Sequence, residues 1–276
     1  MKDIIKTTCL ASLISLAASI SQASVTVEFS DDFGSYSTGD LPKQDAKWRD
    51  SNNSSGGTSV VAVDIGNVFG SGTGNQYLVL AQTGTASANI ASQPITLSNT
   101  GMISFDFATP TAGQSSTLTF RIGTGNSNAM TAFSINLGTG SAVGQRVTTS
   151  DGSTILYNGS TPGTSTHVTI FYNNNNDGSV FSYNEGAFSG SVAANSMDVY
   201  VGNNLVGDNL VRSGSLEKGT ALTAINFLGA NGAKTLEVWL DNISVQSVSS
   251  IPEPSSFAII GGLGVLFLYA LRRRSR

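Results

Sequence analysis

The feature that most constrains this chain is a repeated alternation of apolar and polar residues with a period of two. It is clearest in residues 102–107, 117–122 and 236–240, which read MISFDF, TLTFRI and LEVWL. Such an alternation places the apolar side chains on one face of an extended strand, so each run predicts a half-buried β-strand. The pattern therefore favours an all-β fold.

Short turn signals separate these runs. Asp151-Gly152, Asn158-Gly159, Asp177-Gly178 and Asn231-Gly232 each offer the positive φ that tight turns require. Only 12% of the residues are charged and 31 are glycine, a composition that is unusual for a helical enzyme. Many short strands with turns of this kind predict two packed antiparallel sheets.

Residues 1–23 have the three parts of a secretory signal peptide. Lys2 and Lys6 precede an apolar run, and the small residues Ser21 and Ala23 fit the substrate pockets of a signal peptidase. We therefore expect cleavage after Ala23, which would remove the single cysteine of the chain. The alternative interpretation is a short core helix.

The C-terminal end has the features of a membrane-spanning helix. Residues 255–271 carry no charge and are followed by Arg272, Arg273, Arg274 and Arg276. An uncharged stretch of this length can just span a bilayer. Because basic clusters stay on the cytoplasmic side, the arginines predict that the rest of the chain faces the periplasm or the exterior.

The tripeptide Pro252-Glu253-Pro254 stands directly before this apolar segment. The order of Pro-Glu-Pro, apolar segment and terminal arginines resembles the PEP-CTERM sorting signal of Gram-negative bacteria. The resemblance implies that an exosortase recognises Pro252, Glu253 and Pro254 and removes the tail, while the arginine cluster stops transfer. It also implies anchoring in the inner membrane before processing, and then a place at the cell surface or in the extracellular matrix with exopolysaccharide. A plain single-pass anchor is the alternative.

The chain between its two ends is expected to be one domain. No proline-rich linker or break in composition divides residues 24–248, which lead into the sorting segment 249–276. The domain contains 8 Lys and Arg against 16 Asp and Glu. It therefore lacks the basic surface that nucleic acids require, and we expect no nucleic-acid partner.

The outermost strands of this domain suggest a particular sandwich. Residues 27–33 and 238–245 resemble the first and last strands of concanavalin-like and laminin-G-like jelly rolls, and the runs 168–172, 180–183 and 198–203 resemble the same group. The resemblance implies a two-sheet antiparallel jelly-roll sandwich with adjacent chain ends. Proteins with this fold include sugar-binding proteins, glycosidases and proteins that do neither. The fold alone therefore does not determine the function.

The apolar positions of the last strand change phase after Leu240, and a β-bulge at Asp241-Asn242 would explain the change. If the first and last strands pair, Asp31, Asp32 and Asp241 would meet and offer hard oxygen ligands for a structural Ca²⁺. The alternative is that these aspartates only shape turns and the bulge. No other cofactor is expected.

Residues 173–178 (NNNNDG) mimic part of a calcium loop, and we interpret them as a hairpin turn.

The sequence offers no catalytic constellation. The only histidine, His167, precedes a predicted strand, and residues 163–167 lack the closing glycine of a nucleophile elbow. Glycoside hydrolysis needs two carboxylates that face one bond. The glutamates of the domain are few and widely scattered. We therefore expect that the protein is not an enzyme.

An exposed aromatic ring would give a sugar ring a flat platform, and Tyr183, Tyr200 and Trp239 are the candidates for this role. The alternative is that these out-of-phase aromatic residues fill a second layer of the core. The sequence thus predicts an exported, non-catalytic structural or adhesive component associated with exopolysaccharide. A carbohydrate-binding module is the alternative, and a divergent polysaccharide hydrolase or lyase is a third class.

Overall fold

The computed structural model describes residues 25–40, 46–50, 57–72, 74–83, 87–111, 114–140, 143–159, 161–229 and 235–248. These residues belong to one compact unit, Val25–Ser249. The predicted signal peptide, the sorting motif and the apolar segment 255–271 lie outside the described residues. Within the described residues, the structure contains no helix with the length and hydropathy needed to cross a membrane.

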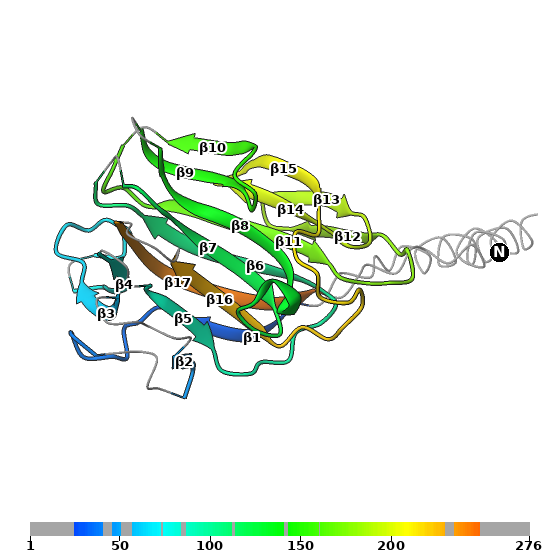
Figure 1. Ribbon diagram of the computed structural model, residues 1–276, viewed down its shortest axis with the longest axis horizontal. Coiled ribbons are helices and arrows are strands. Elements are labelled where there is room, and N and C mark those ends of the chain that lie inside the picture. The colour runs from blue at the N-terminus through cyan, green and yellow to red at the C-terminus, as the bar shows by residue number, and fades with distance from the viewer. Residues whose placement is uncertain are drawn as a thin grey trace, which may run out of the picture. The chain divides into compact units, whose positions relative to one another are not determined.

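The expected all-β, two-sheet antiparallel sandwich is confirmed, because all strands of the two large sheets pair in antiparallel fashion. Sheet A has the order β15 (Asn204–Val211), β14 (Ser196–Val201), β11 (Thr166–Asn173), β6 (Thr100–Ala108), β17 (Leu236–Val248), β4 (Gln76–Gln82) and β3 (Gly57–Val63), with β1 (Val25–Asp31) also paired to β17. Sheet B has the order β10 (Ile155–Gly159), β9 (Val143–Thr149), β8 (Thr131–Gly140), β7 (Thr117–Gly123), β16 (Ala224–Gly229), β5 (Asn89–Ser92) and β2 (Trp48–Asp50). A separate two-stranded sheet is formed by β12 (Phe181–Glu185) and β13 (Phe188–Val192), and a short 3₁₀ turn, η2, spans Asn128–Met130. In Figure 1 the strands of sheet B lie in front of those of sheet A.

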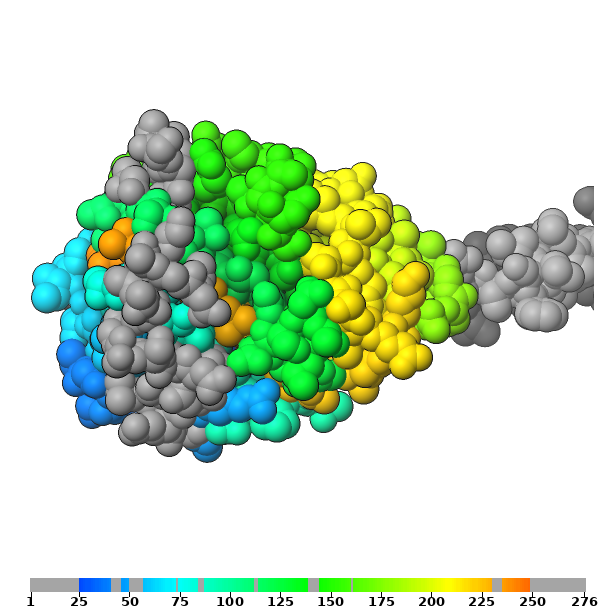
Figure 2. Space-filling view, viewed as in Figure 1, coloured from blue at the N-terminus to red at the C-terminus, as the bar shows by residue number. Residues whose placement is uncertain are grey.

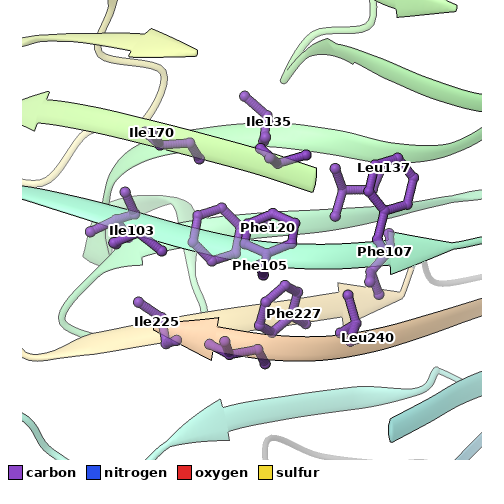
Figure 3. Packing of buried hydrophobic residues seen from close by; sticks show 14 of the residues in the cluster. Ile103, Phe105, Phe107, Phe120, Ile135, Leu137, Ile170, Ile225, Phe227 and Leu240 are labelled. Atoms are coloured by element: carbon purple, nitrogen blue, oxygen red, sulfur yellow. The ribbon is translucent and has the colours of Figure 1, made fainter. Parts of the chain in front are cut away.

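The core lies between the two large sheets and follows directly from the alternation in the sequence. In β6, every second residue is buried, and Phe105 points from there toward sheet B. Its ring lies 5.0 Å from that of Phe120 on β7 and 5.4 Å from that of Phe227 on β16 (Figure 3). Each fully buried ring of this kind stabilises the fold by about 1.5–3 kcal/mol. The same alternation sends the remaining side chains of each strand to the outer faces.

The last strand, β17, is central to sheet A, and its predicted bulge is confirmed. The register with β6 shifts between Asp241 and Ser244, and Asn242 has a φ of 51°. Core residues lie at Leu240 before the bulge and at Ile243 after it. The bulge therefore lets one long strand keep its apolar side chains on the inner face throughout its length.

The turn signals had mixed outcomes. Asp151-Gly152 connects the paired strands β9 and β10, as predicted, whereas Asn158-Gly159 lies inside β10. Asn231-Gly232 lies outside the described residues. The interpretation of residues 173–178 as a hairpin turn was wrong, because β11 pairs with β14 and β6 while β12 pairs with β13.

The physical reason for this difference is a side-chain anchor. The Asn173 amide group donates hydrogen bonds to the carbonyl oxygens of Ser179 and Val192, at 2.8 and 3.0 Å. These bonds hold the β12–β13 hairpin beside sheet A instead of letting β12 continue it. A turn sequence fixes the backbone locally, but it does not choose which strands pair.

Candidate functional site

Three polar side chains lie side by side on the outer face of sheet A. The register of the strands places His167 on β11 opposite Asp106 on β6, and Asp106 opposite Asp241 on β17. The neighbours of Asp106 on β6, Phe105 and Phe107, point into the core. Because successive side chains of a strand alternate between faces, Asp106 and its lateral neighbours point outward.

Hydrogen bonds join these side chains to two asparagines, and we call His167, Asp106, Asp241, Asn242 and Asn75 the polar row. Nδ1 of His167 lies 2.6 Å from Oδ1 of Asp106. The Asn242 side-chain amide donates to Oδ2 of Asp106 at 2.8 Å, and that of Asn75 donates to Oδ2 of Asp241 at 2.7 Å. These bonds fix the orientation of each side chain in the row.

The two aspartates of the polar row differ in exposure. Asp106 keeps 16% of its side chain exposed, whereas Asp241 has 0% exposure. Burial, reinforced by the negative charges of Asp106 and Asp32, raises the pKa of Asp241 to about 6, although hydrogen bonds from Asn75 and the Asn242 backbone oppose the shift. Asp241 is therefore a buried carboxyl group that gains a proton under mildly acidic conditions.

A pocket opens next to the polar row because the edge of β17 changes partner there. Strand β4 pairs with β17 as far as Leu240, and β1 pairs with it from Ile243 onward. The bulge lies in the interval between these two partners. The resulting pocket, which we call the edge pocket, has a volume of about 270 Å³ and is lined by Ser30, Asp31, Asp32, Lys47, Asn242, Ile243 and Ser244.

The predicted pairing of the first and last strands is confirmed, but it does not bring the three aspartates together as a calcium site. Asp31 pairs with Ile243, a core residue, and therefore points inward, whereas Asp241 points outward. In the described part of the chain, no group of three or more His, Cys, Asp or Glu side chains could hold a metal ion. Asp32 accepts a hydrogen bond from the Gly34 backbone at 3.1 Å, as in a simple turn.

The carboxylate of Asp31 already has a full set of hydrogen-bond donors. Oδ2 accepts from Nε1 of Trp48 at 2.6 Å and from the hydroxyl of Tyr36 at 3.1 Å. Oδ1 accepts from the Phe33 backbone at 3.1 Å and from Nζ of Lys47 at 3.4 Å. Since a carboxylate offers about four lone-pair sites, little is left for a metal ion. Asp31 instead anchors the loop that follows β1.

Two of the three predicted sugar platforms are buried. Tyr183 and Tyr200 are 2% and 5% exposed. The Tyr183 ring stacks on Phe171 at 3.8 Å, and its hydroxyl donates to Asp198 at 2.7 Å and lies 2.8 Å from the hydroxyl of Tyr200. Burial raises the pKa of both Tyr183 and Asp198. These tyrosines fill a second apolar layer between the β12–β13 hairpin and sheet A, which is the alternative that the sequence left open.

Trp239 remains half-buried on the outer face of sheet A. Its ring lies 5.0 Å from that of Tyr77, in a small cluster separate from the main core. Its Nε1 donates to Oε1 of Glu237 at 2.8 Å. Of the three aromatic candidates, Trp239 alone keeps part of a ring accessible to a ligand.

Sequence reasoning missed the polar row as a unit. The alternation in residues 102–107 does indicate that Asp106 faces outward, and it places His167 at a predicted strand. However, Asp106 and His167 are 61 residues apart, and only the strand order makes them neighbours. No local signal in the sequence contains this lateral pairing.

Comparison with known families identifies the C-terminal segment. Residues 250–274 match the PEP-CTERM protein-sorting motif. The chain carries a PEP-CTERM sorting motif. The motif is that of an exported protein that an exosortase sorts, and it contains the predicted recognition residues Pro252, Glu253 and Pro254. Among curated proteins, no sequence matches this chain.

Several solved structures are similar to the chain. They include a sialidase, at 14% identity and a TM-score of 0.46. The match covers 84% of this chain and 19% of the sialidase chain. The potassium-bound carbohydrate recognition domain of Emp46p has 13% identity and a TM-score of 0.46, over 80% of this chain and 98% of the other. The globular domain of T. cruzi calreticulin has 10% identity and a TM-score of 0.44, over 91% and 99%. The chain thus spans about a fifth of the length of the sialidase that it matches.

Proposed function

We propose that the exported body is a non-catalytic adhesive component of the cell envelope or matrix, and that it binds exopolysaccharide through the edge pocket and the polar row. The observation that carries this proposal is the edge pocket itself, a polar depression of about 270 Å³ beside a set of fixed hydrogen-bonding side chains. Ligand sites are concave and use a small number of oriented polar groups. The pocket has room for a unit of the size of one sugar ring.

The chemistry of the lining fits sugar hydroxyl groups, which both donate and accept hydrogen bonds. Asp32 supplies acceptors, and Ser30, Ser244 and Asn242 supply both functions. Asn242 is preorganised, because its backbone is held at a φ of 51° and its amide group is fixed by Asp106. A prearranged site loses less entropy when a flexible polymer binds. Trp239 is the aromatic contact that we propose alongside this set.

The same geometry favours binding over cleavage. A glycosidase needs two accessible carboxyl groups on either side of one bond. Asp241 has no exposed surface, and both oxygens of Asp106 are engaged by His167 and Asn242. The polar row therefore offers no second carboxylate to partner Asp32 in acid–base chemistry.

The test is the affinity of the secreted protein for polysaccharide extracted from the matrix of its host, measured by calorimetry. Asp32→Asn removes one charged acceptor but keeps the turn, and we expect it to weaken binding by about tenfold or more. Asp177→Asn is the matched control, because Asp177 also caps an exposed turn, with its Oδ1 at 2.9 Å from the Ser179 backbone nitrogen. Equal affinities of the two variants would contradict the proposed site. Release of oligosaccharides by the wild-type protein would contradict the non-catalytic assignment.

We further propose that the signal peptide is removed after Ala23, that residues 255–271 anchor the chain in the inner membrane, and that the exosortase removes the tail near Pro252–Pro254. The motif match at residues 250–274 supports this route. The test is the intact mass of the protein in the membrane and secreted fractions of its host. A secreted species that ends near the Pro-Glu-Pro tripeptide is the expected result. A full-length tail found only in membranes would instead indicate a plain anchored protein.

A further inference from the structure

Charged residues are divided unequally between the two sheets. The strands of sheet A contain no Lys or Arg, and they contain seven carboxylate residues: Glu28, Asp31, Asp106, Asp198, Asp208, Glu237 and Asp241. The strands of sheet B contain one carboxylate residue, Asp50, and three arginines, Arg49, Arg121 and Arg146. In a domain with twice as many acidic as basic residues, such a concentration of arginine in one sheet is notable.

Two of these arginines point outward from sheet B. Arg121 lies between the core residues Phe120 and Ile122 on β7, so its side chain leaves the opposite face. Arg146 precedes the core residue Val147 on β9 and pairs with Gly138 on β8, so its side chain also leaves the face opposite to the core. Figure 2 shows residues of β7 to β10, in green, on the side that faces the viewer.

Uncharged polar residues lie between the two arginines. Thr119, Asn136 and Thr148 follow one another across β7, β8 and β9 in register, on the same outer face. We call this set, together with Arg121 and Arg146, the arginine face. Arg121 is level with Ser134 and Arg146 with Gly138 on β8. Arg121 and Arg146 are four residues apart along the strand direction and two strands apart across the sheet. Their backbone positions are therefore about 16 Å apart.

Within the described part of the chain, the two guanidinium groups have no carboxylate partner. The ion pairs among the described residues are Lys47–Asp31 and His167–Asp106, and neither belongs to sheet B. Arg121 donates a hydrogen bond to the carbonyl oxygen of Asn126. Nε of Arg146 is buried without a hydrogen-bond partner. Burial also lowers the pKa of Arg121, because it removes part of the water around the guanidinium charge.

We propose that the arginine face binds an acidic polysaccharide, with carboxylate groups of uronic acid units pairing with Arg121 and Arg146. A guanidinium group binds a carboxylate through two parallel hydrogen bonds, and such a ligand would supply the missing partners. The Asn136 and Thr148 side chains between the arginines are buried and are already hydrogen-bonded within the protein, so the two arginines carry the recognition. The separation of about 16 Å exceeds one sugar ring, so the ligand is a polymer that runs obliquely across β7, β8 and β9.

This surface is independent of the edge pocket, because the pocket lies in the interval between β4 and β1 along β17 of sheet A, whereas the arginine face lies on the outer side of sheet B. The carboxylates of sheet A repel a polyanion, whereas the arginine face attracts one. A protein with a neutral-sugar site on one side and an acidic-sugar site on the other would join two polymer strands. It would then act as a cross-link in the matrix.

The test is binding of the full chain, purified in detergent micelles, to polygalacturonate. The matched ligand is carboxyl-reduced polygalacturonate, which keeps the backbone but lacks the charge. We expect the wild-type chain to bind polygalacturonate at low salt, to lose affinity as salt increases, and to bind the reduced polymer at least about tenfold more weakly.

Variants locate the binding surface. Arg121→Gln and Arg146→Gln should each weaken binding to polygalacturonate by about fivefold or more, and Arg146→Lys should have an intermediate effect because it keeps the charge but not the planar donor pair. Lys218→Gln removes one exposed positive charge elsewhere and should change the affinity by less than about twofold. The melting temperature of each variant checks that it is folded.

Three results would overturn the proposal: no binding at low salt, equal binding of the reduced polymer, or an equal loss in Lys218→Gln. Asp32→Asn separates the two proposals, because it should leave polygalacturonate binding unchanged whether or not the edge pocket binds neutral sugars.

Discussion

The two sheets of the sandwich differ in how their half-buried charged side chains are paired. On sheet A, the carboxylates of Asp106 and Asp241 accept hydrogen bonds from Asn242 and Asn75, and Asp106 also contacts His167, so each has polar partners within the protein. On sheet B, Arg121 and Arg146 have no carboxylate partner among the described residues. The inner faces are similar, since both follow the same apolar alternation. The difference teaches that the alternation determines which side chains form the core. The outward-facing residues are not determined by it and can differ between the sheets according to the ligand that each sheet binds.

The compensation on sheet A also has a limit. A buried carboxylate that keeps its partners contributes to the fold, but the loss of a partner leaves a buried polar group without a hydrogen bond. The sheet A carboxylates should therefore be sensitive to substitution in stability measurements. The sheet B arginines should be sensitive in binding measurements instead.

The largest expected effect is the loss of stability caused by Asp31→Ala. This change removes the buried carboxylate that accepts from Nε1 of Trp48 and from the Tyr36 hydroxyl, and we expect the free energy of unfolding to fall by about 3 kcal/mol. Arg146→Gln on sheet B should change it by about 0.5 kcal/mol or less. Urea denaturation of both variants makes the comparison. A similar loss in the two variants would remove the proposed distinction between the carboxylates of sheet A and the arginines of sheet B.

The next effect concerns pH. The pKa of Asp241 is raised from 3.8 to about 6 in the folded protein, so the folded state retains a proton that the unfolded chain releases at lower pH. The free energy of unfolding should therefore decrease as the pH rises from 3.8 to about 6, and this contribution should stay constant above that range. The total change is at most about 3 kcal/mol.

The control for this prediction is Asp241→Asn, which cannot titrate. Asp198, whose pKa burial also raises, adds a change of the same sign, whereas the lowered pKa values of Asp151 and Asp177 act in the opposite sense. The informative quantity is thus the difference between the wild-type and variant curves of unfolding free energy against pH. A difference that does not vary between these pH values would show that Asp241 has an ordinary pKa.

A smaller effect is expected from Tyr183→Phe. The change removes a hydroxyl group that donates to the buried carboxylate of Asp198, and we expect a loss of about 1–2 kcal/mol in the free energy of unfolding. Binding to polysaccharide should be unchanged, because the ring is 2% exposed. A variant with normal stability and weakened binding would restore Tyr183 as a sugar contact.

These comparisons show how far the sequence leads. The alternation in residues 102–107 and the phase change after Leu240 predicted the sandwich and the bulge, because both are local consequences of burying one face of a strand. The polar row and the arginine face could not be predicted, since each depends on which strands are neighbours. Asp106 meets His167 and Asp241 only through the strand order. Similarly, the burial of Tyr183 depends on where the β12–β13 hairpin lies, and the turn sequence before it does not encode that position.

The smallest effect is expected from calcium. The first and last strands do pair, so the geometry that motivated a calcium site is partly present, but the four donors around Asp31 occupy the lone pairs that a metal ion would use. A ligand that binds only the folded state raises its stability in proportion to the logarithm of its concentration. We therefore expect millimolar Ca²⁺ to change the Tm by about 1 °C or less relative to EDTA. A rise of several degrees that EDTA reverses, and that Asp32→Asn abolishes, would mean that Ca²⁺ displaces the Lys47 ammonium group from Asp31. In that case the sheet A carboxylates would be metal ligands rather than groups paired within the protein. Both sheets would then carry charged side chains that bind a ligand, and the contrast between them would be lost.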